Sequence, residues 1–589
     1  DVDGTTETDA LTINGSALKY KAFGSESIMF GDDVTGTISS ADANTGVGVD
    51  VFASLTQGDN NVAIGNAAMN VTTTGGDNVA VGTSALAAQT AGGDNVAIGH
   101  LALSTLTTAG NNVAVGDRAM QASTSGENNV AVGTLAMDAN TTGGSNVGVG
   151  RDALGANTTG DSNVAVGKGA LDANTTASSN TALGTSSLGA NTEGALNTAV
   201  GASALTTNTT GGNNVAVGFA ALQLSTTSSD NTAVGYAAMN ANTTGTDNVA
   251  VGYTALDANT TGDFSTAIGS FALSTATTAD ANTGVGYSAL YLNTTGSQNT
   301  AVGRAALEAN TTGSDNVAVG HRALAATTTG SRNVAVGEDA GKNVTTGQEN
   351  VLIGRDCGDS LTSGNQNVAI GMECFIDATS ASEVVAIGFQ ALENSTGGSN
   401  TAVGYKAGED VTSGTNNFFF GKETGRSGSP GGSITSGNNE GVLGNSNVSK
   451  INTQVSITVA SDERDKTDFQ PLDAGLDFVN QLTPYTYYWD KRTNYVDWEE
   501  NPDTDLDTIE HDGTHKEDWM DIGFKAQDVI ALEKAIGHDL EDKTNLVSHR
   551  TSDGKMYQLQ YEKFVPILVK AVQELTAKVE TLEEQLNGE

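Results

Sequence analysis

Residues Asn129–Ser145 read NVAVGTLAMDANTTGGS, and this 17-residue unit decides the fold because it recurs along most of the chain. The glycine that ends NVAVG returns at every seventeenth position from Gly48 to Gly388. Gly404 and Gly421 follow at steps of 16 and 17, which makes 23 copies in all. Self-similarity at a fixed short period indicates a stack of structural repeats.

Each unit combines a short strand with a turn. Val130 and Val132 alternate with a small residue, which favours a strand, because residues two apart share a face. In the Asn-Thr-Thr-Gly segment at 140–143, we expect Asn and Gly to take positive φ at a corner. Each unit also carries a small and a large apolar residue, Ala136 and Met137. Stacked units should bury the Val and Leu/Met columns continuously, and each strand should pair with the strand of the next coil.

The repeat length and the proline distribution point to an all-β solenoid, or β-roll. A pair of helices with their turns needs about 30 or more residues, so helical repeats are excluded. All five prolines lie at or beyond Pro430, as expected where a lost N–H would break a ladder. We predict an N-terminal connector over residues 1–43 and a β-roll shaft over 44–425.

Asparagine recurs at the strand start, as in Asn61 and Asn78, and again in the Asn-Thr-Thr-Gly segments. We interpret these columns as stacked amide ladders. The alternative is calcium bound by preceding aspartates such as Asp77 and Asp94. Calcium needs six or more oxygen ligands, and these aspartates are irregular from coil to coil. We therefore expect no metal and no other cofactor.

Two further features interrupt the small-residue pattern. The only cysteines, Cys357 and Cys374, are separated by one repeat length and should lie one above the other. In-register neighbours are further apart than a disulfide prefers, so we expect two buried thiols.

The aromatic run Phe418–Phe420 either plugs the end of the roll or contacts a ligand, and we favour the plug. A Gly/Ser-rich linker and distal tip should follow over 426–460.

The pattern NVAVGxxALxxNTTG resembles the head repeats of trimeric autotransporter adhesins and related repeats of phage tail fibres. The resemblance covers residues 44 to about 425 and implies three chains wound into one left-handed β-roll trimer. The period here is longer than the roughly fourteen-residue adhesin repeat, so the handedness and cross-section stay open.

Beyond the repeats, the composition becomes that of an ordinary α+β domain. Residues 461–466 read SDERDK, residues 521–529 read DIGFKAQDV, and an apolar-periodic helix follows near the C-terminus. Together these motifs resemble the peptidase S74 family, the intramolecular chaperone of endosialidases, tail spikes and tail fibres. The resemblance covers about residues 461–589. It implies that Ser461 is the nucleophile, Lys466 its partner, and Ala460–Ser461 the bond that is cut after trimer assembly.

The chemistry of this pair can be argued from the residues themselves. A serine hydroxyl attacks well only when a base takes its proton, and a neutral lysine can do so. Burial or the nearby Arg464 would favour the neutral lysine, whereas Asp462 and Asp465 would oppose it. A spacing of five residues does not bring the two side chains together on a helix or a strand. Without the accompanying motifs, the segment reads as a solvated charge cluster.

The last helix carries apolar residues at alternating steps of three and four, which is typical of a coiled-coil seam. Valine at a and leucine at d would favour two strands, whereas the family is trimeric, and we rank the trimer above the dimer. The seam residues are Val565, Leu568, Val572, Leu575, Val579, Leu582 and Leu586.

Charge and hydropathy exclude two classes of partner. The formal net charge is −42, with 69 acidic and 27 basic residues, so the chain repels duplex nucleic acid. No run of about 18 apolar residues appears, so we expect no membrane insertion. The sequence opens at Asp1 without a signal-like segment, which is compatible with a start upstream of Asp1.

The combined expectation is a virion tail fibre that acts outside the host cell. Its homotrimer would join the phage baseplate or tail at its N-terminal end and contact a host receptor, a glycan or outer-membrane component, at its tip. The C-terminal domain would act as a single-turnover serine autoprotease without an external substrate. One alternative is a bacterial trimeric surface adhesin, although that class ends in a membrane anchor. The other alternative is a glycan-degrading tail spike. Its chemistry needs two carboxylates several ångströms apart, and the shaft shows only scattered acidic residues without a distinctive pair.

Overall fold

The computed structural model describes residues 12–13, 16–17, 20–21, 27–31, 40–448, 450–452, 454, 461–496, 501 and 504–588. The chain divides into two compact units, Asp1–Thr329 and Gly330–Glu589. Each unit is described by itself below.

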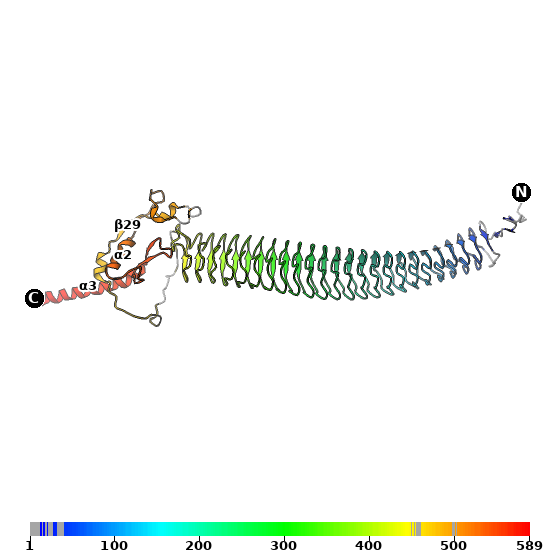
Figure 1. Ribbon diagram of the computed structural model, residues 1–589, viewed down its shortest axis with the longest axis horizontal. Helices are drawn as coiled ribbons and strands as arrows, with labels where there is room; N and C mark the ends of the chain where they lie inside the picture. The colour runs from blue at the N-terminus through cyan, green and yellow to red at the C-terminus, as the bar shows by residue number, and fades with distance from the viewer. Residues whose placement is uncertain are drawn as a thin grey trace. The chain divides into compact units, whose positions relative to one another are not determined.

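The first unit is a parallel β-ladder in which each strand pairs with the strand of the next coil (Figure 1). Before it, β1 (Thr12–Ile13) pairs with β2 (Ser16–Ala17), and β3 (Tyr20–Lys21) pairs antiparallel with β4 (Ile28–Phe30). Strand β4 already pairs in parallel with β5, so the ladder begins ahead of residue 44. The following three-residue strands recur once in every repeat: β5 (Thr45–Val47), β6 (Val62–Ile64), β7 (Val79–Val81), β8 (Val96–Ile98), β9 (Val113–Val115), β10 (Val130–Val132), β11 (Val147–Val149), β12 (Val164–Val166), β13 (Thr181–Leu183), β14 (Thr198–Val200), β15 (Val215–Val217), β16 (Thr232–Val234), β17 (Val249–Val251), β18 (Thr266–Ile268), β19 (Thr283–Val285), β20 (Thr300–Val302) and β21 (Val317–Val319).

The second unit starts with coils of the same kind. The coil between β25 and β26 is one residue shorter than the repeat, and the coil between β27 and β28 is longer than the repeat. The ladder therefore extends beyond residue 425 and ends at β28. Its strands are β22 (Val334–Val336), β23 (Val351–Ile353), β24 (Val368–Ile370), β25 (Val385–Ile387), β26 (Thr401–Val403), β27 (Phe418–Phe420) and β28 (Gly441–Leu443). The predicted β-solenoid with 17-residue spacing and about 23 turns is confirmed.

The face of each strand that points inward differs from the prediction. In β10 the middle residue, Ala131, is buried, whereas Val130 is half-buried and Val132 is 36% exposed. Asn129, two residues before Ala131, is also buried, and so are Ala136 and Met137. The prediction that the Val columns are buried is therefore wrong. Alternation places Asn and Ala on the inner face, so both Val columns lie on the outer face.

The amide ladder is confirmed. The Asn146 backbone N–H donates to Asn129 Oδ1 at 2.9 Å, and its side-chain amide donates to Gly160 O at 2.9 Å. A second buried column follows the Asn-Thr-Thr-Gly segments, where the Asn157 amide donates to Asn140 Oδ1 at 2.8 Å. Most buried amides thus find partners in the neighbouring coils, which makes a polar interior tolerable; Asn208 Oδ1 and Asn310 Oδ1 are exceptions.

The corners with positive φ are not where the sequence suggested. Neither Asn140 nor Gly143 has positive φ, whereas Leu135, Met137 and Ser145 have φ of 58°, 52° and 58°. Gly143 is needed for another reason, because a Cβ there would lie 2.5 Å from the carbonyl oxygen of Gly160. The expected role of the Asn-Thr-Thr-Gly segment is therefore wrong: its Asn faces the interior, and its Gly allows close approach of the next coil.

The two cysteines are free and buried, as predicted. Their Sγ atoms are 2.9 Å apart. The hydrogen bond between the two thiols, together with burial, raises the pKa of the Cys357 thiol far above its usual range. The pair therefore behaves as apolar filling in the alanine column.

The second unit also contains a small α+β domain, as predicted (Figure 1). Two antiparallel pairs of strands accompany three helices, and Phe478, Val529 and Phe564 lie in its core. Its elements are η1 (Glu463–Asp465), α1 (Leu476–Gln481), β29 (Tyr485–Tyr487), η2 (Arg492–Tyr495), η3 (Leu506–Thr508), β30 (Asp521–Gly523), α2 (Ala526–Ala535), β31 (Ser548–Arg550), β32 (Tyr557–Leu559), η4 (Tyr561–Lys563) and α3 (Phe564–Asn587).

Helix α3 is 24 residues long, and its buried residues lie in its N-terminal part, where Glu574 also accepts the Leu476 backbone N–H at 2.7 Å. Phe564, Ile567 and Ala571 are its buried residues. All seven predicted seam residues are exposed, by 44% to 78%. The helix therefore presents an apolar seam that is exposed among the described residues. None of the helices within the described residues has the length and hydropathy to cross a membrane.

Candidate functional site

Ser461 and Lys466 lie together. The Lys466 ammonium donates a hydrogen bond to Ser461 Oγ, with Nζ and Oγ 2.5 Å apart. A serine hydroxyl in contact with a lysine nitrogen has the geometry required of a nucleophile and its base. The structure thus brings together the two residues that the sequence singled out.

A single 3-10 turn produces this contact. Asp462 is the N-cap of η1, and its Oδ1 accepts the backbone N–H of Arg464 at 2.9 Å. The Lys466 backbone N–H closes the turn on Glu463 O at 3.1 Å. The turn brings the side chains of Ser461 and Lys466 together although they are five residues apart. Neither a continuous helix nor a strand would do so. An Asp two residues before a turn residue is a readable capping signal.

The charges around the pair are arranged differently from the expectation. Arg464 forms a two-pronged contact with Asp462, with Nη2 to Oδ2 at 2.6 Å and Nε to Oδ1 at 3.0 Å. This hydrogen bond lowers the pKa of the Asp462 carboxyl and raises that of Arg464. Arg464 therefore pairs with Asp462. Ser461 and Lys466 are both exposed in the single chain.

The other predicted site residues lie elsewhere. Ala460 falls outside the described residues. Phe419 is fully buried at the end of the ladder, and its ring lies against Gly408 and Gly425, where a Cβ would have no room. Phe418 and Phe420 point outward, are 42% and 44% exposed, and contact each other with ring centroids 5.8 Å apart. The run therefore combines an inner plug with an outer aromatic pair.

The GFKAQDV motif has a structural role in this domain. Gly523 ends β30, and a Cβ there would collide with the hydroxyl of Tyr561. That hydroxyl accepts the Phe524 backbone N–H at 3.0 Å, and the Phe524 ring stacks on Phe564 with centroids 5.3 Å apart. The motif thereby joins the start of α2 to the start of α3.

The hairpin β31–β32 contacts the end of the ladder, which the sequence analysis missed. Its turn reads Ser552-Asp553-Gly554, an Asp-Gly signal that could have identified a hairpin. Hydrogen bonds join the hairpin to the last coils. The bonded pairs are Ser433 N–Asp553 Oδ2 (3.0 Å), Ser552 N–Gly431 O (3.3 Å), Lys555 Nζ–Ser427 Oγ (3.1 Å), Ser552 Oγ–Glu440 Oε2 and Gln558 Nε2–Pro430 O.

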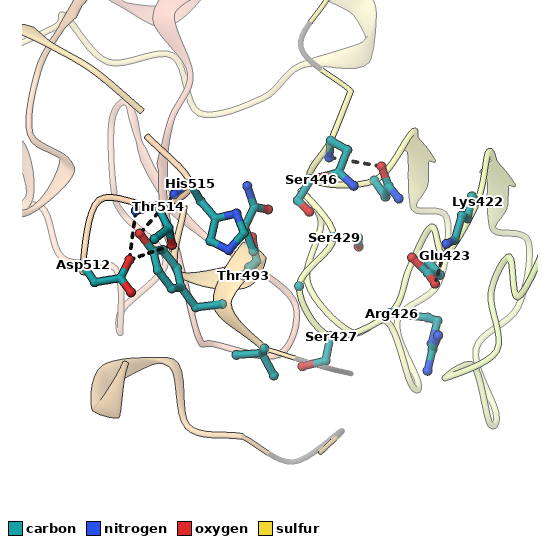
Figure 2. Close-up of a pocket in the computed structure, with 16 residues that line it drawn as sticks. Lys422, Glu423, Arg426, Ser427, Ser429, Ser446, Thr493, Asp512, Thr514 and His515 are labelled. Atoms are coloured by element: carbon teal, nitrogen blue, oxygen red, sulfur yellow. Dashed lines mark hydrogen bonds and ion pairs between the residues drawn. The ribbon is translucent and has the colours of Figure 1, made fainter. Parts of the chain in front are cut away.

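A charged cleft of about 860 Å³ lies beside this contact (Figure 2). One side comes from the last coils, with Lys422, Glu423 and Arg426, and the other from the α+β domain, with Asp512 and His515. Neither Ser461 nor Lys466 lines it. The two sides belong to segments before and after residue 460, so the cleft exists only while both remain docked.

Within the described part of the chain, no three His, Cys, Asp or Glu side chains converge as metal ligands. The aspartates considered for calcium, such as Asp77 and Asp94, are therefore not part of such a cluster.

Comparison with known families supports the domain at the C-terminal end. Residues 461–538 match the family model described as the chaperone of endosialidase, peptidase S74. Comparison with curated proteins and with solved structures gave no match. The β-solenoid ladder and this matched region together fit a tail fibre that ends in a chaperone domain.

Proposed function

We propose that this protein is a phage tail fibre whose residues 461–589 assist assembly of a homotrimer and then separate by cutting the Ala460–Ser461 bond. The observation that carries the proposal is the 2.5 Å contact between Ser461 Oγ and Lys466 Nζ at the first residue of the matched family region. The long ladder supports the fibre role, because stacked coils make an extended surface from a short repeat.

The cleavage step balances with one water molecule. Neutral Lys466 takes the proton of the Ser461 hydroxyl, and Oγ attacks the carbonyl carbon of Ala460. The C–N bond breaks as the Ser461 nitrogen receives the proton, which leaves an ester between Ala460 and Ser461 Oγ. Water then hydrolyses the ester, giving a carboxylate at Ala460 and restoring the hydroxyl. Because Lys466 is exposed in the single chain, assembly would supply the burial that favours its neutral form.

Two features support the assembly role. The α3 seam is apolar and exposed, as expected of a helix that packs against its copies in a trimer. Hydrogen bonds join the β31–β32 hairpin to the last coils at Ser427, Ser433 and Glu440. A polar contact of this kind can hold the ladder end during folding and dissociate once the covalent link is cut.

The remaining parts of the proposal concern location. The fibre would belong to the virion and act outside the host cell, with its N-terminal end joined to the baseplate or tail. Cleavage would leave the segment from Phe418 to Ala460 as the distal tip, where we propose contact with a host-surface glycan or outer-membrane component.

The test is expression of the full chain beside Ser461→Ala and Lys466→Arg variants, followed by denaturing gels and intact-mass measurement. The parent should yield a fragment that ends at Ala460 and a second that begins at Ser461. Both variants should stay uncut, because the first lacks the hydroxyl and the second holds a side chain that stays protonated.

The matched control is Thr467→Ala, which removes a neighbouring hydroxyl that contacts Asp468 rather than Lys466. It should be cut like the parent. A parent chain that stays whole after assembly would disprove the cleavage step. Native mass measurement of the product tests the trimer separately.

A further inference from the structure

Aromatic side chains gather in one stretch of the first unit. No Phe, Tyr or Trp occurs between Phe52 and Phe219, and none occurs between Tyr291 and Phe375. Seven aromatic residues lie within residues 219–291, a stretch of five successive coils from β15 to β19. Strands and glycines of the same kind precede and follow this stretch, so the aromatic residues are not part of the repeat pattern itself.

Six of these rings contact one another in a continuous series. In three successive coils the residue directly after the repeated glycine is aromatic. These three rings are stacked, with centroids 5.4 Å and 5.2 Å apart and interplanar angles of 16° and 10°. We call the whole series the aromatic band. It consists of Phe219, Tyr236, Tyr253, Phe271, Tyr287 and Tyr291.

The band continues through a coil in which the residue after the glycine is not aromatic. That residue is Ser270, but the next residue, Phe271, supplies a ring. The Phe271 ring makes T-shaped contacts with Tyr253 and Tyr287, with centroids 5.4 Å and 5.8 Å apart. A ring is therefore present in every coil of the stretch, although it comes from two different sequence positions.

The ladder does not need these rings in order to stack. In coils outside the band, the position after the glycine holds small or polar side chains, for example Thr83, Thr134 and Ala202. Those coils pair with their neighbours in the same register as the coils of the band. The rings at this position in the band are 49% to 52% exposed. Contiguous apolar surface that a soluble protein leaves in water marks an interaction site.

A row of polar side chains borders the band, five residues after each glycine. The Asn240 amide donates to the Ala220 carbonyl, next to the first ring of the band, at 3.0 Å, and to Gln223 Oε1 at 3.1 Å. In the following coils, the Ser274 hydroxyl donates to Asp257 Oδ1 at 2.7 Å. The side chains of this row are half-buried, so amide, hydroxyl and carboxylate groups are accessible beside the rings.

We propose that the aromatic band binds a neutral polysaccharide that lies along the ladder. A sugar ring has an apolar face of C–H groups, which packs on aromatic side chains, and hydroxyl groups, which exchange hydrogen bonds with amide, carboxylate and hydroxyl side chains. The band and its polar border supply both kinds of group. Successive rings are 5.2–5.8 Å apart, which is comparable to the length of one sugar unit, so successive units can meet successive coils.

Charge favours a neutral partner over an anionic one. No Lys or Arg occurs between Lys168 and Arg304, and the charged residues within 219–291 are five aspartates. An anionic polysaccharide would therefore meet only like charge at the band. A second copy of the chain fits poorly, because the same position holds Arg151 and Lys168 in other coils, and copies in register would place these like charges together.

The inference goes beyond the proposed contact at the distal tip. It places a second binding surface on the side of the ladder, in the coils from β15 to β19. It does not depend on cleavage of the Ala460–Ser461 bond or on the number of chains in the assembly.

Affinity electrophoresis of the full chain tests the band. The chain is run in native gels that contain dextran, mannan or galactan, and in gels that contain dextran sulfate as an anionic counterpart. At least one neutral polysaccharide should retard the parent, and dextran sulfate should not. The double variant Tyr236→Thr with Tyr253→Thr removes two rings, and Thr occurs naturally at this position in other coils. It should weaken the apparent affinity at least about tenfold, as expected when central contact residues are lost.

The matched control removes a stacked pair outside the band. Phe389 and Tyr405 occupy the same position in the second unit, with centroids 5.4 Å apart and an interplanar angle of 15°. Lys406 and Lys422 lie over the Tyr405 ring, so this pair lacks the uncharged surroundings of the band. The double variant Phe389→Thr with Tyr405→Thr should be retarded like the parent. Gels without polysaccharide give the reference mobility of each variant.

The outcomes separate this inference from the proposed function. Selective loss of retardation in the Tyr236/Tyr253 variant supports the band. The inference is overturned if none of the three neutral polysaccharides retards the parent, if only dextran sulfate does, or if both double variants lose affinity equally. Capture of an outer-membrane protein by the parent but not by the Tyr236/Tyr253 variant, without any retardation by polysaccharide, would also overturn it. None of these results bears on cleavage or trimer formation, which are measured on other gels and by native mass.

Discussion

The ladder and the α+β domain both bury polar side chains, and they satisfy them in opposite ways. In the ladder, Asn146 bonds to Asn129 one coil before and to Gly160 in the next turn, and the same pattern recurs along the stack. In the domain, the buried carboxylate of Glu533 accepts three backbone N–H groups from Leu546–Ser548, at 2.6 to 3.1 Å. The Asn hydrogen bonds recur from coil to coil along the ladder, whereas the Glu533 contact occurs once in the domain.

This difference bears on whether the ladder and the α+β domain each bury their side chains within one chain. A coil finds its partners in adjacent coils, so the interior of the ladder is complete within one chain. The domain is too small to cover α3, and its apolar seam stays exposed. The proposed homotrimer would cover this seam.

The largest loss of stability is expected at glycines that lie against the backbone of the next coil. Gly150 has φ of 135°, and a Cβ there would lie 2.5 Å from the Gly167 carbonyl oxygen. Gly150→Ala should cost about 1–3 kcal/mol for the backbone conformation alone, and the clash adds to it. Limited proteolysis should reveal opening of this coil.

The matched control for this prediction is Gly155→Ala in the same coil. Its Cβ would approach the Asp172 side chain, which can move, and the backbone there does not require positive φ. Equal protease sensitivity of the two variants would contradict the prediction.

A smaller effect is expected from removing one rung of the amide ladder. Asn146→Ala leaves the buried Asn163 backbone N–H without its side-chain acceptor, whereas the Gly160 carbonyl keeps the Asn157 amide as a donor. One unsatisfied buried group should cost about 1–3 kcal/mol, measured as a lower midpoint of urea unfolding. The exposed Asn66→Ala should be neutral, because Ala202 occupies the same column naturally. A neutral Asn146→Ala would show that the ladder tolerates unpaired amides.

The smallest effect is expected in the domain and depends on pH. His538 Nε2 lies 3.0 Å from Asp473 Oδ1. Burial lowers the pKa of His538, but the hydrogen bonds to Asp473 and Thr544 outweigh it, so the pKa is raised; the pKa of Asp473 is lowered by the same bond with His538.

The raised histidine pKa stabilises the fold below about pH 6.5, and this contribution disappears as the pH rises through the folded value. The lowered aspartate pKa contributes above about pH 3.9 and disappears as the pH falls. His538→Gln should therefore lower the melting temperature more at pH 5.5 than at pH 8.5, and only slightly because Asp473 is exposed. Tryptophan fluorescence of the uncut Ser461→Ala chain is the readout, since all three tryptophans lie beyond residue 461. The same loss at both pH values would contradict the role of this pair.

Much of the fold could be predicted because the regular spacing of the repeats gives the length of one coil. The coil length, the amide ladder and the stacked thiols of Cys357 and Cys374 followed from spacing, whereas the small α+β domain followed from the change in composition and the family resemblance. The inward face was predicted wrongly, because alternation says that Val130 and Ala131 face opposite ways without saying which way is in. Alanine was underrated as a core residue, although so short a coil leaves little space for larger side chains.

The candidate site divides in the same manner. Ser461 and Lys466 could be singled out through the family resemblance, but their contact could not be derived from a five-residue spacing. It depends on the η1 turn and its Asp462 cap. The pairing of Arg464 with Asp462 was equally hidden, because the sequence places three acidic and two basic residues within reach and does not choose among them.

The sequence by itself determined the period, the parallel stacking and the position of the chaperone-like region, since these depend on local patterns repeated or matched along the chain. Only the tertiary structure decided which columns face the interior, where positive φ lies, and that the hairpin at Ser552–Gly554 holds the end of the ladder. These depend on contacts between residues distant in sequence, whose geometry arises when coils close and when segments more than a hundred residues apart dock.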